Sequence, residues 1–207
     1  ICGANIITEF VAKGFQALNA TADGYSKPYD ASRNGINLGE AAATVVLSTS
    51  HFSTIQVKGG SVSNDANHIS GPSRTGAELA KTAELALAES EIQATDLAFI
   101  SAHGTATVFN DEMESKAFEL AGLSEVPLQS LKPHFGHTLG AAGVLESIIS
   151  IKALKEGIVL PSLNYNEYGV SGKITVNQKN QAVYQRNILK TASGFGGCNA
   201  SVVYSKK

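Results

Sequence analysis

The chain has 207 residues, 43% of them hydrophobic and 16% charged, which is enough to bury the core of an ordinary globular domain. Its formal net charge of −2, without runs of like charge, argues against nucleic acid or an anionic membrane as the main partner. No apolar stretch approaches the roughly 20 residues that span a bilayer, and no signal peptide is evident. We therefore expect a soluble, cytoplasmic protein.

The cysteines and the first residue set two further expectations. Cys2 and Cys198 are too few for a disulfide framework and match no zinc-ligand spacing, which fits a reducing compartment and predicts no metal site. The chain begins at Ile1, and its only methionine is Met113. We therefore expect these residues to belong to a longer polypeptide, so that a site assembled from them alone is incomplete.

The first part of the chain predicts turns, a strand and a helix. A stretch rich in Gly, Pro, Asp and Asn at 23–35 leads into AATVVLS at 42–48, which is typical of a buried strand. Breakers at Gly71 and Pro72 then precede a helical pattern at 76–90. Its apolar residues fall on one helix face: Leu79, Ala83, Ala86 and Leu87.

Two strand, loop and helix units follow. LAFISA at 97–102 is typical of a strand covered on both faces, and a polar helical stretch follows at 110–122. VPLQS at 126–130 begins the second unit, which continues through a loop into a helix that Gly157 can end. The apolar positions of this helix are Leu145, Ile148, Ile149 and Leu154. Two such units predict a mostly parallel α/β sheet.

The C-terminal residues depart from this alternation. ILKTAS at 188–193 and NASVVYS at 199–205 flank the glycine-rich turn at 194–197, which predicts neighbouring antiparallel strands. The sheet of this α/β fold is therefore expected to be mixed. We find no linker that divides the chain into independent domains.

Polar or glycine-rich segments follow the predicted strands at three junctions: 103–105, 132–137 and 194–197. Ligands of open α/β sheets bind at the carboxyl ends of strands, so these segments are expected to converge on one pocket. A lone histidine is usually structural, but His103 and His137 at equivalent junctions favour a catalytic role. The other histidines lack such support and are expected to be structural or on the surface: His51, His68 and His134.

Small residues and one aromatic mark the rest of the predicted pocket. The run at 140–143 contains only Gly and Ala, which predicts a helix that packs closely against another element. It also allows the helix N-terminus, with its unpaired N–H groups, to approach a pocket where negative charge develops. Phe195 lies among glycines, either in an ordinary hairpin turn or as a ring that gates the pocket.

Four segments then appear in a characteristic order: YDASRNGINLGEAAATVVL at 29–47, AHGTATVFNDEME at 102–114, SLKPHFGHTLGAAG at 130–143 and SGFGGCNASVVY at 193–204. Together they resemble the β-ketoacyl-acyl-carrier-protein synthases of the thiolase-like superfamily. The resemblance implies a layered α/β fold, αβαβα in the complete protein. Residues 1–58 would end its N-terminal half, and residues 59–207 would form the whole C-terminal half.

The resemblance also implies a role for individual residues. His103 and His137 would be the catalytic histidines, and Lys132 would be the site lysine, with Glu114 as its carboxylate partner. Phe195 would be the gating aromatic. The residues that would contact the phosphopantetheine arm of the substrate are Thr105, Thr107 and Ser70. Asp111 is expected to be structural, and Cys2 and Cys198 are expected to be packing residues.

The implied reaction is a decarboxylative Claisen condensation in fatty acid or polyketide synthesis. Malonyl-acyl carrier protein loses carbon dioxide, and the resulting enolate attacks an acyl chain held on a cysteine, which is expected upstream of Ile1. Neutral imidazole N–H groups of His103 and His137 can stabilise the negative charge on the thioester oxygen. No cofactor is expected beyond the phosphopantetheine arm of the carrier protein.

The implied partners are an acyl carrier protein, the N-terminal portion of the same protein, and a second subunit in a homodimer or a ketosynthase-type heterodimer. A non-catalytic, chain-length-factor-like subunit is the main alternative, and both histidines argue against it. A thiolase is a weaker alternative, and a carrier-protein-binding module does not need His103, Lys132 and His137 together. Three positions differ from the family pattern and leave the acyl preference open: Ser193, Pro133 and Phe135.

Overall fold

The computed structural model describes residues 1–49 and 53–207. Its centre is a six-stranded sheet in the order β3-β10-β9-β4-β5-β7, in which β9, β4, β5 and β7 run parallel and β10 runs antiparallel to both neighbours. The predicted mixed sheet is therefore confirmed. The strands of this sheet are β3 (Ile55–Asn64), β4 (Leu97–Ser101), β5 (Pro127–Gln129), β7 (Thr175–Val176), β9 (Asn187–Gly194) and β10 (Cys198–Lys206).

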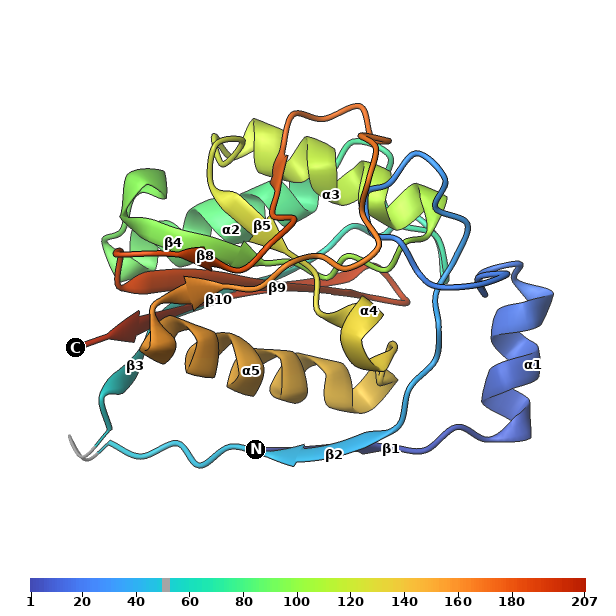
Figure 1. Ribbon diagram of the computed structural model, residues 1–207, viewed down its shortest axis with the longest axis horizontal. Helices are drawn as coiled ribbons and strands as arrows, with labels where there is room; N and C mark the ends of the chain where they lie inside the picture. The colour runs from blue at the N-terminus through green and yellow to red at the C-terminus, as the bar shows by residue number, and fades with distance from the viewer. Residues whose placement is uncertain (50–52) are drawn as a thin grey trace.

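Helices cover both faces of this sheet (Figure 1). α2 (Ala77–Ser90) and α3 (Val108–Leu120) lie on one face, whereas α4 (Lys132–Phe135) and α5 (Ala142–Glu156) lie on the other. All five residues of β4 are buried, as the continuous apolar run predicts. The predicted apolar face of α2 is buried as well, with Ala83 and Ala86 fully inaccessible. The predicted strands and helices of this part are confirmed.

Short elements complete the chain. They are the 3₁₀ turns η1 (Ala94–Asp96) and η2 (Leu139–Ala141), and a small antiparallel ladder of β6 (Ile158–Val159) with β8 (Gln181–Ala182). The boundary predicted between residues 58 and 59 falls within β3 and stays a prediction. No helix within residues 1–49 and 53–207 has both the length and the apolar character needed to cross a bilayer.

The helix α5 buries only part of the apolar face that the sequence predicts, because, of the four predicted residues, only Leu154 is buried. It ends at Gly157 as expected, with φ at 70°, but Leu145, Ile148 and Ile149 are only half-buried. The side chains buried against the central sheet include polar ones, namely Glu146, Ser147 and Ser150. The reason is that Glu146 forms ion pairs with Lys132 of α4 and Lys190 of β9, which turns the polar face of the helix inward.

The N-terminal residues form a separate hairpin-like layer below α5 (Figure 1). β1 (Cys2–Asn5) pairs antiparallel with β2 (Ala41–Thr44), and α1 (Glu9–Ala17) stands apart from the body without a buried residue. A Cβ at Gly3 would lie 2.9 Å from the carbonyl oxygen of Gly140, so this layer packs closely against the small residues before α5. The close packing predicted for the run at 140–143 is confirmed at Gly140 and Ala141, whereas a Cβ at Gly143 would meet no atom within 4 Å.

The strand predicted at 42–48 is shorter and less buried than expected. β2 ends at Thr44, and Val46 and Leu47 are 85% and 56% exposed. The prediction of a buried strand is wrong for this part of the chain. Within the described residues, β2 pairs only with β1, so nothing covers its apolar continuation.

Candidate active site

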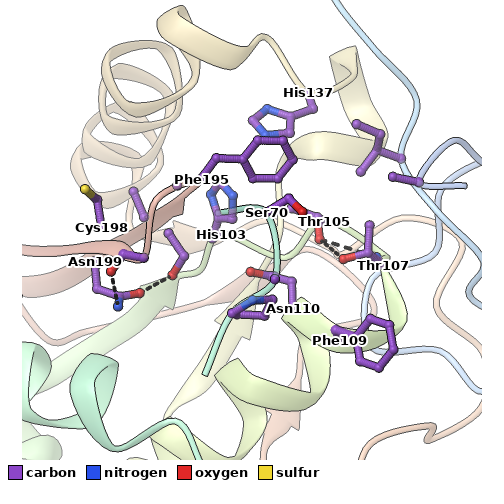
Figure 2. Close-up of a pocket in the computed structure, with 18 of the residues that line it drawn as sticks. Ser70, His103, Thr105, Thr107, Phe109, Asn110, His137, Phe195, Cys198 and Asn199 are labelled. Atoms are coloured by element: carbon purple, nitrogen blue, oxygen red, sulfur yellow. Dashed lines mark hydrogen bonds between the residues drawn. The ribbon is translucent and has the colours of Figure 1, made fainter. Parts of the chain in front are cut away.

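A cavity of about 1340 Å³ opens at the carboxyl ends of β4 and β9, beside the start of α5 (Figure 2). It receives residues from all three of the predicted junctions. Six of the predicted site residues line it: His103, Thr105, Thr107, His137, Phe195 and Ser70. The other two, Lys132 and Glu114, are buried and do not line the cavity. Lys132 contacts the ring of His103, and Glu114 contacts its backbone N–H. The structure thus brings the predicted residues together, and their catalytic roles stay predictions.

Glu114 fixes the turn that presents His103. Its carboxylate accepts hydrogen bonds from the backbone N–H groups of His103, at 2.8 Å, and Gly104, at 2.6 Å. It also accepts from Tyr29 Oη at 3.0 Å and Asn110 Nδ2 at 3.0 Å. Gly104 has φ at 44°, and a Cβ there would lie 2.5 Å from the Cβ of Ser130, so the turn requires glycine.

The ion-pair partner of Lys132 is Glu146, not Glu114. Lys132 Nζ lies 2.7 Å from Glu146 Oε1, and both side chains are buried. The prediction that Glu114 pairs with this lysine is wrong, because the Glu114 oxygens already accept the N–H and O–H donors of its own turn. Lys132 Nζ also donates to the backbone oxygen of His103 and lies 3.2 Å from His103 Nδ1.

The rings of His103 and His137 lie together, with centroids 5.2 Å apart and an interplanar angle of 84°. The backbone N–H of Leu139 donates to His137 Nδ1 at 3.1 Å. An ammonium group only donates, so His103 Nδ1 accepts from Lys132 in the same way. With both Nδ1 atoms acting as acceptors, we assign the proton of each neutral ring to Nε2.

The surroundings keep both rings uncharged. Burial, followed by the charges of Lys132 and other neighbours, holds the pKa of His103 well below 6.5. Burial and then Lys132 lower the pKa of His137 to about 3. At neutral pH each ring therefore offers an Nε2–H donor without first releasing a proton. Two neutral donors beside one cavity suit a site where negative charge develops on an oxygen.

Three buried residues of this site were not among the predicted ones: Glu146, Lys190 and Tyr29. Lys190 Nζ lies 2.7 Å from Glu146 Oε2, so this carboxylate pairs with two lysines. Burial raises the pKa of Glu146, but the charges of Lys132 and Lys190 lower it further, so that it lies below its usual value. The available signal was a charged residue inside an apolar pattern, a glutamate within VLESIIS and a lysine within ILKTAS.

Asp111 stabilises the segment after His103. Its carboxylate accepts from the backbone N–H groups of Tyr29 at 2.7 Å, Thr105 at 3.0 Å and Ala106 at 3.2 Å. Burial and the charge of Glu114 raise the pKa of Asp111 to about 7, against the opposing effects of the Tyr29 N–H, the Asn110 side chain and the charge of Arg33. It does not line the cavity, in keeping with the structural role expected for it.

Hydroxyl groups line one wall of the cavity. Thr105 and Thr107 form a hydrogen bond between their Oγ1 atoms at 2.8 Å, drawn as a dashed line in Figure 2. Ser70 also lines the cavity, in a loop that His68 stabilises, because His68 Nδ1 accepts from the backbone N–H groups of Ser70 and Gly71. These hydroxyls add to the polar groups that the histidines bring to the cavity.

Phe195 lies at the turn between β9 and β10, and its side chain is 56% exposed. Gly196 and Gly197 have φ near 80°, which only glycine adopts easily. The ring stacks on Phe15 of α1, with centroids 5.7 Å apart. In Figure 2 the rings of Phe195, His103 and His137 gather at the same end of the cavity.

The remaining predicted residues differ in their outcomes. Cys2 and Cys198 are exposed, so the expectation that they pack in the interior is wrong in this structure, and Cys198 lines the cavity. Ser193 lines the cavity and donates to Asn199 Oδ1 at 2.8 Å. His134 is exposed and contacts the carbonyl of Pro161. His51 lies outside the described residues.

Comparison with known proteins identifies the family of this chain. A family model described as "Beta-ketoacyl synthase, C-terminal domain" matches residues 54–166. The chain is 36% identical over 189 residues to 3-oxoacyl-[acyl-carrier-protein] synthase 2 of Rhizobium meliloti (strain 1021), an alignment that covers 86% of this chain and 45% of that protein. The chain therefore spans about half the length of such relatives.

Two solved structures extend the comparison. A β-ketoacyl synthase from Burkholderia phymatum STM815 superposes with a TM-score of 0.88 at 26% identity, covering 100% of this chain and 54% of that one. A chain from a ketosynthase in complex with its chain length factor, from Xenorhabdus doucetiae, gives a TM-score of 0.92 at 27% identity, covering 99% and 52%. With more than half of its residues matched by the family model and a thiolase-like fold shared with solved ketosynthases, this chain belongs to the β-ketoacyl synthase family.

Proposed function

We propose that this chain supplies the decarboxylation centre of a β-ketoacyl synthase, an acyltransferase of fatty acid or polyketide synthesis. The malonyl thioester loses its carboxylate as carbon dioxide, and the electron pair of the broken bond forms an enolate. The enolate carbon attacks the carbonyl of an acyl group held on a cysteine, and the thiolate leaves. That cysteine comes from an N-terminal portion of the same protein, because the hydrogen-bond partners of Cys2 and Cys198, Thr44 Oγ1 and Asn64 Nδ2, are not bases that could activate a nucleophile.

The paired histidines are the observation that carries this proposal. Each ring has Nδ1 occupied as an acceptor, by Lys132 in His103 and by the Leu139 N–H in His137. The Nε2–H groups are left to donate to a thioester oxygen as it becomes negative. Since burial keeps both rings neutral, the donors are preorganised and need no proton transfer before the reaction.

The shape of the cavity supports a substrate on a flexible arm. The hydroxyls of Thr105, Thr107 and Ser70 line the route past the histidines and can hydrogen-bond the amide groups of a phosphopantetheine arm. Phe195, on its glycine turn, lies where a ring can gate access to the acyl pocket. An acyl carrier protein is the partner that would deliver this arm, in keeping with the name of the Rhizobium meliloti relative.

A chain-length-factor-like subunit is the second candidate. The match to a chain in a ketosynthase and chain length factor complex supports a ketosynthase-type heterodimer. A subunit that only shapes an acyl tunnel has no use for two neutral histidine donors backed by the Lys132–Glu146 ion pair. A reactive cysteine in the N-terminal portion distinguishes the two candidates, because only the catalytic subunit needs it.

Substitution of the histidines tests the proposal. In the full-length protein, His103→Ala and His137→Ala should each slow carbon dioxide release from a malonyl thioester by about 10²–10³, since each removes one oxyanion donor. Transfer of an acyl group to the cysteine should be much less affected. His134→Ala is the matched control, because His134 is exposed on α4, close to His137 in sequence, and does not line the cavity. Near-normal carbon dioxide release from either site variant would refute the assignment.

A further inference from the structure

Lys190 of β9 is a second buried lysine at this site, and its side chain is only 4% exposed. Its Nζ lies 2.7 Å from Glu146 Oε2, and Lys132 Nζ lies 2.7 Å from Oε1 of the same carboxylate. Two ammonium groups therefore share one carboxylate, and each takes one oxygen. Burying a charge is costly unless the charge is paired. Lys132, Lys190 and Glu146 together bury one more positive charge than negative charge, which suggests that the second lysine has a function.

The hydrogen bonds of Lys190 connect three elements behind the cavity. Its Nζ donates to the carbonyl of Thr191 at 2.6 Å on β9, and to those of Ser101 at 3.3 Å and Ala102 at 3.5 Å at the end of β4. Glu146 belongs to α5. Ala102 immediately precedes His103, whose own carbonyl accepts from Lys132. The two lysines therefore hold consecutive carbonyls at the point where His103 leaves its strand.

We propose that Lys190 is a positioning residue for the decarboxylation centre, where it orients Glu146 toward Lys132, fixes the backbone beside His103, and supplies a positive charge that keeps both histidine rings in the neutral, donating form. This inference rests on the proposed function for its role in the reaction. Its electrostatic part concerns the rings themselves and can be measured without turnover.

The charged groups around Lys190 define what its removal should do. They are Glu146 from α5, Lys132 from α4, His103 and His137 at the cavity, and Glu114 from α3, which lies 3.5 Å from Thr191 Oγ1. After burial and Lys132, Lys190 is one of the groups that lower the pKa values of His103 and His137. Loss of its charge should therefore raise both pKa values, while Lys132 and Glu146 remain as a balanced pair.

The experiment compares three substitutions of Lys190 in the full-length protein. Lys190→Met and Lys190→Gln remove the charge, and Gln keeps an NH₂ group that can donate hydrogen bonds, whereas Lys190→Arg keeps the charge. Lys152→Met is the matched control, since Lys152 is exposed on the same helix as Glu146. The pKa values of His103 and His137 are measured by NMR titration of isotope-labelled histidine rings. The pH dependence of carbon dioxide release from a malonyl thioester is measured in parallel.

The two neutral variants should raise the titration midpoints of both histidines by about one pH unit. The acidic limb of carbon dioxide release should move up by a similar amount. Lys190→Arg and Lys152→Met should leave both unchanged. Unchanged midpoints in a folded neutral variant, or equal shifts in Lys190→Arg, would overturn the inference. So would failure of both neutral variants to fold while Lys190→Arg folds, because Lys190 would then serve folding alone.

The two readouts separate this inference from the proposed function. If the wild-type protein releases no carbon dioxide, the proposed function fails, yet the histidine titration still decides whether Lys190 controls the charge of the rings. If the wild-type protein is active and the midpoints do not move, the inference about Lys190 fails by itself.

Discussion

The residues that touch His103 and His137 decide what these rings can do. Lys132 and the Leu139 N–H occupy one nitrogen of each ring, and burial removes the water that would stabilise a charged imidazole. The result is a pair of oriented neutral donors at the edge of the cavity. A buried histidine held neutral also affects stability, because the unfolded chain takes up a proton that the folded chain refuses.

This linkage predicts the acid sensitivity of the folded chain. The pKa of His137 is about 3 when folded and near 6.5 when unfolded. Its contribution to stability is therefore complete above pH 6.5 and is lost as the pH falls toward 3. Between about pH 7.5 and about pH 5 this loss amounts to roughly 2 kcal/mol.

His137→Asn removes this titration. The fall in the free energy of unfolding between the two pH values, measured by urea denaturation, should be about 2 kcal/mol smaller in this variant than in the wild type. The same replacement at the exposed His134 serves as the control. An equal fall in the wild type and in His137→Asn would show that the folded protein does not keep this ring neutral.

At the scale of elements, turns that require glycine place the site residues at the ends of β4 and β9. The turn after β4 depends on Gly104, whose positive φ and contact with Ser130 exclude a side chain. The turn after β9 depends on Gly196 and Gly197, and a Cβ at Gly197 would lie 2.3 Å from Asp65 Oδ1. The backbone at these positions therefore contributes to the site as directly as the side chains.

Gly104→Ala should destabilise the protein by more than about 2 kcal/mol, because it forces both a strained φ and a clash with Ser130. Gly24→Ala is the control, since a Cβ at Gly24 meets no atom within 4 Å, and it should change stability by less than about 0.5 kcal/mol. Urea denaturation measures both. Equal stabilities of the two variants would mean that the turn after β4 tolerates a side chain.

Phe195→Ala should change the acyl-chain preference or the order of substrate loading while leaving the fold intact. The reason is that the ring is 56% exposed, stacks only on Phe15 among the ring contacts of the described residues, and lines the cavity. Competition between acyl thioesters of different length in the full-length protein is the measurement. Tyr184→Ala, at an exposed aromatic outside the cavity, is the control. If Phe195→Ala keeps the wild-type preference, the ring is not a gate.

At the scale of the whole molecule, the sequence predicted individual strands and helices, but it did not predict which buried charged side chains pair with one another. The continuous apolar run of β4 and the helical spacing of α2 identified these elements from sequence. The partner of Lys132 was not found in this way, because a sequence pattern does not show which carboxylate lies beside it: Glu146 is 14 residues away, on the next helix. Lys190 was missed for the same reason, since only the tertiary fold shows that a strand lysine faces a helix glutamate.

The N-terminal layer of the molecule exposes several large apolar residues. Ile6, Phe10 and Val46 are 70%, 87% and 85% exposed, on or beside β1, α1 and β2. Several large apolar residues exposed in one part of the chain suit burial against further protein. It supports the proposal that an N-terminal portion of the same protein completes the site and brings the nucleophilic cysteine.

The most direct test of the central claim is the structure of the full-length protein with a malonyl thioester analogue that cannot lose carbon dioxide. The two-donor arrangement predicts that the thioester carbonyl oxygen lies within about 3 Å of Nε2 of both His103 and His137, with each Nδ1 still bound to Lys132 or the Leu139 N–H. A thioester oxygen bound away from both rings, or a ring turned so that Nδ1 faces the substrate, would contradict it.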